Sequence, residues 1–215
     1  MYNGRFSTIS LPLLFLLLLC NIFSPRIATA QAETMLAGAD YDPITPPVPQ
    51  TGDKPAVVEV FNFKCPHCFT LHPYMDSWSE KNHDKYDIAS IPVFWGKQTD
   101  MPVRAFYAAE FLGKGALMKD AIFKANFEHS VNIESADELG FLAEEAGLNP
   151  EKFKSYLNSF GVSAKIAQAK VEQRKYGVHS TPTLVVNGKY RVSFGKHANG
   201  DHIRLFKIVE TLAAQ

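Results

Sequence analysis

Neither sign of charge is in excess, because 22 lysines and arginines stand against 22 aspartates and glutamates in 215 residues. Proteins that bind nucleic acids carry a basic surplus, so the composition argues against that class of partner. Internal repeats and low-complexity tracts are also lacking, which excludes collagen-like and low-complexity chains. Hydrophobic residues make up 46% and charged residues 20%, values typical of a globular protein of one domain, or of one domain with an insertion.

Long apolar runs are absent except between residues 11 and 20, a stretch that follows Arg5. About ten apolar residues are too few for a bilayer, which takes roughly 20 in a helix, so a membrane protein with several spans is excluded. Ala28-Thr29-Ala30 then offers small residues in the pattern of a cleavage site. This order predicts a secretory signal peptide over residues 1–30 that is cleaved after Ala30 in the Sec route.

A lipoprotein is the competing interpretation of the same segment, with Cys20 as the acylated residue. Leu19 precedes it, where lipid-attachment sites have a small residue, so we favour cleavage without acylation.

Cysteine is scarce in the exported part, where only Cys65 and Cys68 remain. Two cysteines in an oxidising compartment usually pair, and a structural disulfide is the simplest interpretation. A ring this short stabilises a fold little in the loop-entropy account, which favours a redox-active pair. Zinc needs four ligands, and only His67 and His72 stand near enough to complete a Cys2His2 set. We therefore expect redox chemistry and no metal.

The neighbouring residues predict where these cysteines lie. Val57 to Phe63 is rich in β-branched and aromatic residues and predicts a buried strand. Pro66 suits the first turn of a helix, which we expect to run to about Asn82. Cys65 would then lie at the helix N-terminus, where unpaired N–H groups stabilise a thiolate, and Cys68 one turn further. That spacing is within reach of a disulfide.

The remaining pattern predicts an α/β fold. A second strand, parallel to the first, is expected from Asp87 to Phe94, and helices fill residues 99–161. After a longer helix, Asn187-Gly188 predicts a hairpin, and a last amphipathic helix covers about Asp201 to Ala213. This is a thioredoxin fold with a helical domain inserted between its βαβ and ββα halves. The predicted division is an arm at 31–54, a thioredoxin-like domain at 55–98 and 162–215, and the inserted domain at 99–161.

Cys65-Pro66-His67-Cys68 after the first strand, and Thr181-Pro182 before the strand at 183–187, resemble the DsbA family of thiol:disulfide oxidoreductases. The resemblance covers essentially the whole exported chain. It implies a monomeric periplasmic oxidase without a cofactor. Such an oxidase donates its disulfide to unfolded or reduced exported proteins, and a quinone-linked partner in the inner membrane reoxidises it.

The family's functional residues fall on four positions around the cysteines. The resemblance makes Cys65 the exposed nucleophile, Cys68 the buried resolving cysteine and His67 a residue that stabilises the thiolate. Glu59 matches the family's buried acid and is expected to handle the proton of Cys68. The basic residue that usually pairs with this acid has no clear counterpart in Ala89–Phe94.

The second motif implies the substrate-binding loop. Pro182 matches the cis-proline that faces the cysteines, and Thr181 would present its backbone to an extended peptide. Well-known members carry valine at the position of Thr181, so the threonine is a departure that bears on partner choice and redox potential. The remaining histidines are expected at the surface: His72, His83, His129, His179, His197 and His202.

Two alternatives remain open at this point. A disulfide isomerase or reductase would share the fold, but such isomerases add an N-terminal dimerisation domain for which residues 31–54 are too short. A holdase for exported proteins, with a merely structural disulfide, would use exposed aromatic residues and no redox chemistry.

Overall fold

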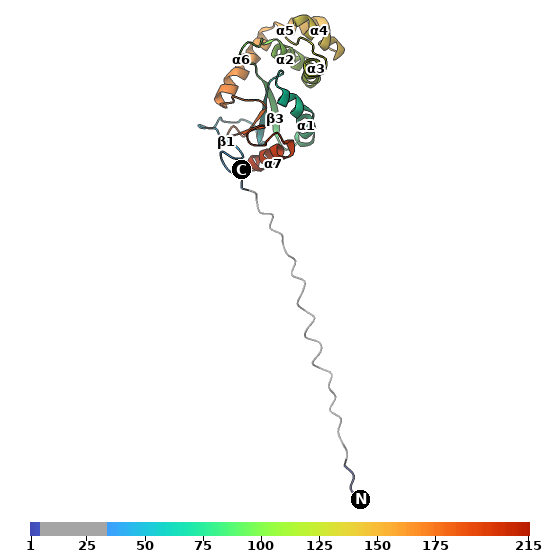
Figure 1. Cartoon of the computed structure of the whole chain (residues 1–215), viewed down its shortest axis with the longest axis vertical. Helices are drawn as coiled ribbons and strands as arrows, with labels where there is room; N and C mark the ends of the chain where they lie inside the picture. The colour runs from blue at the N-terminus through green and yellow to red at the C-terminus, as the bar shows by residue number, and fades with distance from the viewer. Residues whose placement is uncertain (5–33) are drawn as a thin grey trace. The chain divides into compact units, whose positions relative to one another are not determined.

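The computed structural model describes residues 1–4 and 34–215, and residues 34–215 form one compact unit (Figure 1). The predicted signal peptide, its cleavage site after Ala30 and Cys20 lie outside the described residues. The predicted division of the folded part into a thioredoxin-like and an inserted domain stays a prediction.

One mixed sheet of five strands forms the centre, in the order β1-β5-β4-β2-β3. Strand β2 pairs parallel with β3 and antiparallel with β4, as a βαβ unit followed by a hairpin requires. Five of the six residues of β2 are buried, because its valines and Phe61 meet covering elements on both faces. The strands are β1 (Asp42–Pro43), β2 (Ala56–Phe61), β3 (Asp87–Pro92), β4 (Thr183–Val186) and β5 (Tyr190–Ser193).

Seven helices surround the sheet in the described residues, and the predicted helical block between the two halves is confirmed. In Figure 1, α1 and α7 lie on one side of the sheet and α6 on the other, while α2 to α5 gather at one end. The helices are α1 (Pro66–Asn82), α2 (Met101–Phe111), α3 (Gly115–Phe127), α4 (Ala136–Glu145), α5 (Pro150–Leu157), α6 (Phe160–Lys175) and α7 (His202–Ala213).

Local side chains define where several of these helices begin. Ser135, Asn149 and Ser159 each accept a hydrogen bond from a backbone N–H of the first turn of α4, α5 and α6. At the hairpin, Asn187 and Gly188 both have positive φ, 51° and 62°, which the tight turn between β4 and β5 requires. These short-range signals are the ones that sequence patterns carry best.

Aromatic packing joins the helical block to the sheet. Phe61, the last residue of β2, and Phe63 just after it contact Phe106 of α2 and Phe123 of α3 with ring centroids 5.2–6.2 Å apart. All four rings are buried, and pairs at these separations add to the free energy of burial. The start of α1, which follows Phe63 directly, is thereby held between the sheet and the block.

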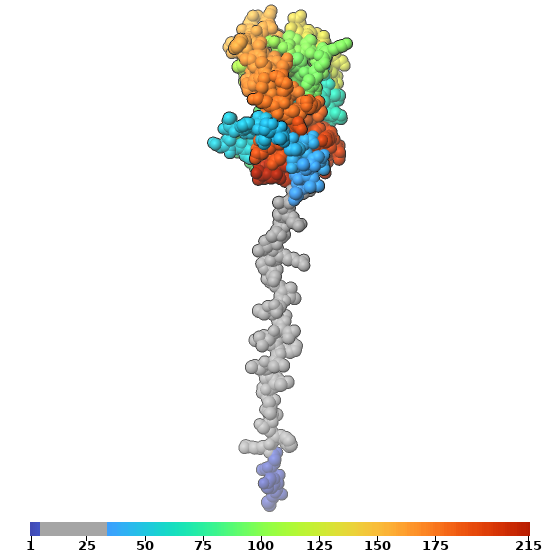
Figure 2. Space-filling model, turned by 90° about the vertical axis from the view of Figure 1, so that its left-hand side faces the viewer, coloured from blue at the N-terminus to red at the C-terminus, as the bar shows by residue number. Residues whose placement is uncertain are grey.

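The N-terminal arm contributes to the sheet. Asp42 and Pro43 form the edge strand β1 beside β5, and Ile44 is buried. Pro43 is tolerated there because an edge strand leaves one row of N–H groups without ladder partners. Figure 2 shows the arm, in blue and light blue, on the surface below the orange α6.

Two histidines contradict the expectation that all six lie at the surface. His72 is buried in α1 against the ring of Phe123, at a centroid distance of 5.0 Å. His197 is also buried, and its Nδ1 accepts a hydrogen bond from the Ser193 N–H. Neither contact leaves a sequence pattern, because each joins a histidine to a backbone or ring in its folded surroundings.

Candidate active site

Cys65 and Cys68 lie at the start of α1, as the sequence predicts, and both are free thiols in the structure. Cys65 is the N-cap residue in an extended conformation, and Pro66 follows in the first turn. The Cys65 carbonyl accepts hydrogen bonds from the N–H groups of Cys68 and Phe69. Cys65 is partly exposed and Cys68 is buried, so reagents reach the two sulfurs unequally.

The surroundings of Cys65 favour its thiolate. A hydrogen bond from the Cys68 side chain is the main cause that lowers the pKa of Cys65 from its ordinary value of 9.0 to about 5. Partial burial opposes this shift, and the Thr181 side chain and the backbone N–H groups of Cys68 and His67 add to it. At pH 7 a thiol with that pKa is about 100-fold more often thiolate than thiol.

The pKa of Cys68 is shifted in the opposite direction, upward. Burial raises the pKa of Cys68 far above its ordinary value, and the neighbouring Cys65 raises it further. The Asn62 N–H, 3.5 Å from the Cys68 sulfur, offsets only part of this effect. The two sulfurs, one helical turn apart, therefore differ in both charge and access.

The fold brings the Thr181-Pro182 loop to the cysteines. The peptide bond between these residues is cis, and Pro182 is buried. The Cys65 sulfur lies 3.3 Å from the Thr181 carbonyl oxygen, to which the thiol donates. The Thr183 hydroxyl donates to the Ser180 carbonyl at 2.9 Å and closes the loop.

The His67 side chain stands apart from the sulfur. His67 is exposed, and its ring lies edge-on to Phe194 at a centroid distance of 6.4 Å. The hydrogen bond by which His67 lowers the pKa of Cys65 comes from its backbone N–H. Backbone and side chain of this residue can therefore be tested separately.

Glu59 is buried with a partner that the sequence did not indicate. Its side chain is 1% exposed, and its Oε2 accepts from Lys119 Nζ at 2.6 Å and from Ser90 Oγ at 2.9 Å. Ser90 is the β3 residue paired with Glu59, and it lies within Ala89–Phe94, the segment that holds no basic residue. The base comes from α3 instead. One signal could have found it, because Lys119 lies on the helix face that buries Met118, Ile122 and Phe123.

Lys64, next to Cys65, forms an ion pair. Its Nζ lies 3.0 Å from Glu134 Oε1, which also accepts the Thr99 N–H. This pair is partly exposed and joins the start of α1 to the loop before α4. The negative charge of Glu134 partly neutralises the positive charge of Lys64, so Lys64 is not an isolated positive charge beside the Cys65 sulfur.

Within residues 1–4 and 34–215, no group of three or more histidine, cysteine or acidic side chains has the arrangement of a metal site. Within the same residues, no helix is long and apolar enough to cross a membrane.

A thioredoxin-type sheet with a Cys-x-x-Cys pair at a helix N-terminus, facing a cis-proline loop, defines the class of thiol:disulfide oxidoreductases. Comparison with known proteins agrees with this class. The family model described as DSBA-like thioredoxin domain matches residues 86–200. The chain belongs to this DsbA family and is a thiol:disulfide oxidoreductase.

Individual relatives cover most of the chain. The thiol:disulfide interchange protein DsbA of Pseudomonas aeruginosa is 33% identical over 168 residues, which are 77% of this chain and 79% of the relative. The crystal structure of Pseudomonas aeruginosa DsbA superposes with a TM-score of 0.76 at 30% identity, covering 84% of this chain and 93% of that one. Oxidoreductase DsbA from Xylella fastidiosa gives 0.74 at 28% identity, with coverages of 84% and 96%.

We expect the reduced protein to alkylate at Cys65 alone in mildly acid solution, with a rate that titrates near pH 5. Since the pKa is lowered in the fold, this group stabilises the reduced protein above the ordinary thiol range, and the contribution is lost as pH falls through about 5. Thiolate absorbance against pH, with Cys65→Ser as the control, measures it. A midpoint near 8.5 would contradict the assignment.

Proposed function

We propose that the protein oxidises pairs of thiols in unfolded or reduced exported proteins, with Cys65 as the attacked sulfur and Cys68 as the resolving one. The observation that carries this assignment is the difference between the two cysteines: Cys65 is accessible and favoured as a thiolate, while Cys68 is buried and favoured as a thiol.

The chemistry follows from this difference. In the oxidised enzyme a substrate thiolate attacks the Cys65 sulfur, the Cys65–Cys68 bond breaks, and Cys68 leaves and takes up a proton. A second substrate thiolate then attacks the substrate sulfur of the mixed disulfide, and Cys65 leaves as a thiolate. The substrate loses two electrons and the enzyme gains them. A low pKa at Cys65 makes it the better leaving group and stabilises the reduced enzyme, so the disulfide is oxidising.

The loop before β4 is proposed to hold the substrate. Thr181 is partly exposed beside Cys65, and its backbone can pair with an extended peptide as an added strand. Pro182 carries no N–H, which leaves the side facing the sulfurs without a competing backbone donor. The Thr181 hydroxyl adds a donor to the thiolate that valine would lack.

His67 and Glu59 complete the proposed site. The exposed imidazole of His67 follows Pro66 in the ring between the cysteines, where a positive charge would favour the Cys65 thiolate. Glu59, buried beside β3, is proposed to exchange the proton of Cys68.

The surroundings of the enzyme are proposed from family resemblance and from the N-terminal segment. We place the mature protein in the periplasm after Sec export and cleavage following Ala30, as a monomer without a cofactor or metal. An inner-membrane, quinone-linked partner would remove the two electrons that each cycle leaves on Cys65 and Cys68.

Three activities are separated by one set of measurements on wild type, Cys65→Ser and Cys68→Ala. We expect the oxidised wild type to introduce disulfides into a reduced protein substrate, Cys65→Ser to be inactive, and Cys68→Ala to accumulate mixed disulfides through Cys65. Reduction of insulin that outpaces oxidation would favour a reductase or isomerase. Unimpaired prevention of aggregation by Cys65→Ser, with no oxidation by the wild type, would favour the holdase.

Replacing His67 should change the redox potential without unfolding the protein. His67→Ala keeps the backbone N–H and removes an exposed ring, so we expect a disulfide less oxidising by some tens of millivolts, where about 30 mV corresponds to about 1.4 kcal/mol. Equilibration with glutathione measures the potential. An unchanged potential would assign the effect of His67 to its backbone alone.

Thr181→Val should raise the pKa of Cys65 by about one unit and make the disulfide less oxidising, because the thiolate loses one hydrogen-bond donor. Thr70→Val is the control, since that exposed hydroxyl bonds the Pro66 carbonyl and not a sulfur. Thiolate absorbance and the glutathione equilibrium report both quantities. An equal Cys65 pKa and an equal redox potential in wild type and Thr181→Val would show that the Thr181 hydroxyl does not stabilise the thiolate.

A further inference from the structure

Strand β3 is an edge of the sheet, because it pairs with β2 on one side and with no strand of the described residues on the other. The Asp87 N–H donates to the Pro55 carbonyl, just before β2, and the direction of these groups alternates along a strand. The N–H and C=O groups of Ile88 and Ser90 therefore point away from β2. Within residues 1–4 and 34–215, none of them has a hydrogen-bond partner.

A groove follows this open edge between α1 and α6, which lie on opposite sides of the sheet (Figure 1). One hollow of about 640 Å3 is lined by residues 88–91 of β3 together with residues of α1, α2, α3 and α6. A second hollow of about 500 Å3 is lined by the start of β3 and the end of the N-terminal arm. The two hollows share His83, Ile88 and Ala89, so they form one groove along the strand.

Acidic side chains outnumber basic ones along this groove. The acidic residues that line it come from α1, β3, α2 and α6, and they are Asp76, Asp87, Glu110 and Glu172. The lysines that line it are Lys119 and Lys165, and the charge of Lys119 is matched by its ion pair with Glu59. The groove therefore favours an occupant with positive charge.

A second copy of this chain does not suit the groove. Pairing of two β3 edges would bring the same carboxylates together from both copies, and like charges repel one another. Charges and proline are also the features by which edge strands avoid pairing with themselves, and Pro92 ends β3. The edge is protected against its own kind and stays open to a basic strand.

We propose that the groove along β3 binds an extended, basic segment of polypeptide, which joins the sheet as an added strand beside Ile88 and Ser90. The source of that segment rests on the proposed function, since it would belong to an unfolded exported protein that the enzyme oxidises. The Thr181 loop leads into β4, on the other side of β2 from β3. A long unfolded chain can therefore occupy the loop and the groove together, which strengthens its binding.

The first experiment locates the bound peptide. The probe is an acetylated peptide of about eight alternating lysine and valine residues, which has the length of a strand and no cysteine. We expect it to slow amide hydrogen exchange at Ile88 and Ser90, whose N–H groups point outward. Exchange at Ala89 should not change, because its N–H already faces β2.

Two further peptides separate strand pairing from charge attraction. The lysine and valine peptide with every backbone nitrogen methylated keeps its charges but has no N–H to donate, so we expect it to bind about tenfold more weakly. A peptide of alternating glutamate and valine keeps its N–H groups and should not bind. Equal binding of the methylated peptide would contradict strand addition.

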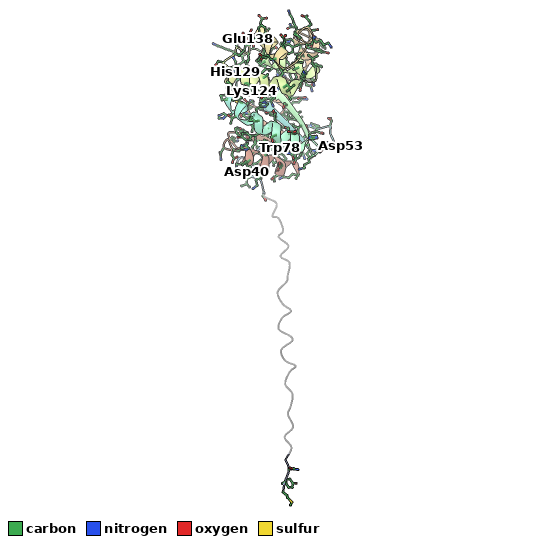
Figure 3. All side chains as sticks on the ribbon, turned by 90° about the vertical axis from the view of Figure 1, so that its right-hand side faces the viewer. Asp40, Asp53, Trp78, Lys124, His129 and Glu138 are labelled. Atoms are coloured by element: carbon green, nitrogen blue, oxygen red, sulfur yellow. The ribbon has the colours of Figure 1, made fainter. Side chains whose placement is uncertain are left out.

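Variants of the protein test the charge of the groove. Glu110→Gln with Glu172→Gln removes two carboxylates and should weaken binding about fivefold at low salt, and less as salt increases. Glu138→Gln with Glu144→Gln is the control, since it changes the net charge equally at exposed positions of α4. Figure 3 shows Glu138 well above Asp53, which follows the arm residues that line the groove. The control pair should bind as wild type does.

Ala89→Arg tests the groove and its link to catalysis. Ala89 is exposed, so the substitution fills the groove with a long cation and should abolish peptide binding without unfolding the protein. A reduced dithiol peptide joined to the basic segment by a flexible linker should be oxidised with a KM about tenfold lower than the dithiol peptide alone, at unchanged kcat. Ala89→Arg should remove that difference.

Unchanged exchange at Ile88 and Ser90 with saturating peptide would overturn the proposal, as would equal weakening in the two glutamine pairs. Dimers that protect these two amides without peptide would overturn it in favour of a second copy. Equal KM values for the linked and unlinked substrates would overturn the assignment to substrate proteins. If the wild type binds the basic peptide but oxidises neither substrate, the proposed function fails and the groove remains, so the two failures are distinguishable.

Discussion

Burial of β2 on both faces is the constraint on which the site depends. Val57, Val60 and Phe61 are fully buried, so the strand cannot shift its register without exposing them. The end of β2 therefore fixes the position of Cys65, between the Thr181-Pro182 loop and the aromatic contacts of α2 and α3. The antiparallel partner β4 follows Pro182 directly, so the same ladder that holds β2 also brings Thr181 against the Cys65 sulfur.

Cys65 and Cys68 have the same side chain and lie one helical turn apart at the start of α1. Cys65 lies outside the first turn, where N–H groups have no helical acceptor, and it receives hydrogen bonds as a thiolate. Cys68 lies inside the turn among apolar groups, where a charge would be desolvated. The difference needs no unusual residue, because it comes from position along a helix that begins with proline. Sequence spacing alone could therefore indicate it.

Features that depend on contacts between distant segments of the chain leave only weak patterns in the sequence. The strand at β2, the start of α1 and the hairpin at Asn187-Gly188 could be predicted, because each is encoded within a few residues. The pairing of β1 with β5 could not, since an edge strand of two residues has no periodicity. The charged partner of Glu59 lies on α3, 60 residues away, and not on the neighbouring strand β3. Only the folded insertion makes the two adjacent.

The pair of Glu59 and Lys119 is poorly explained by stability. Removing two charges from water costs several kcal/mol for each ion, and apolar side chains of similar volume often replace such a pair without loss. The neighbours of the pair are mixed, because Lys119 lies over the Phe61 ring while Ser90 donates to the carboxylate of Glu59. What the pair fixes is position, because it joins β2 to α3 across 60 residues of the chain. The helical insertion is therefore held on the sheet by a buried ion pair as well as by its aromatic contacts.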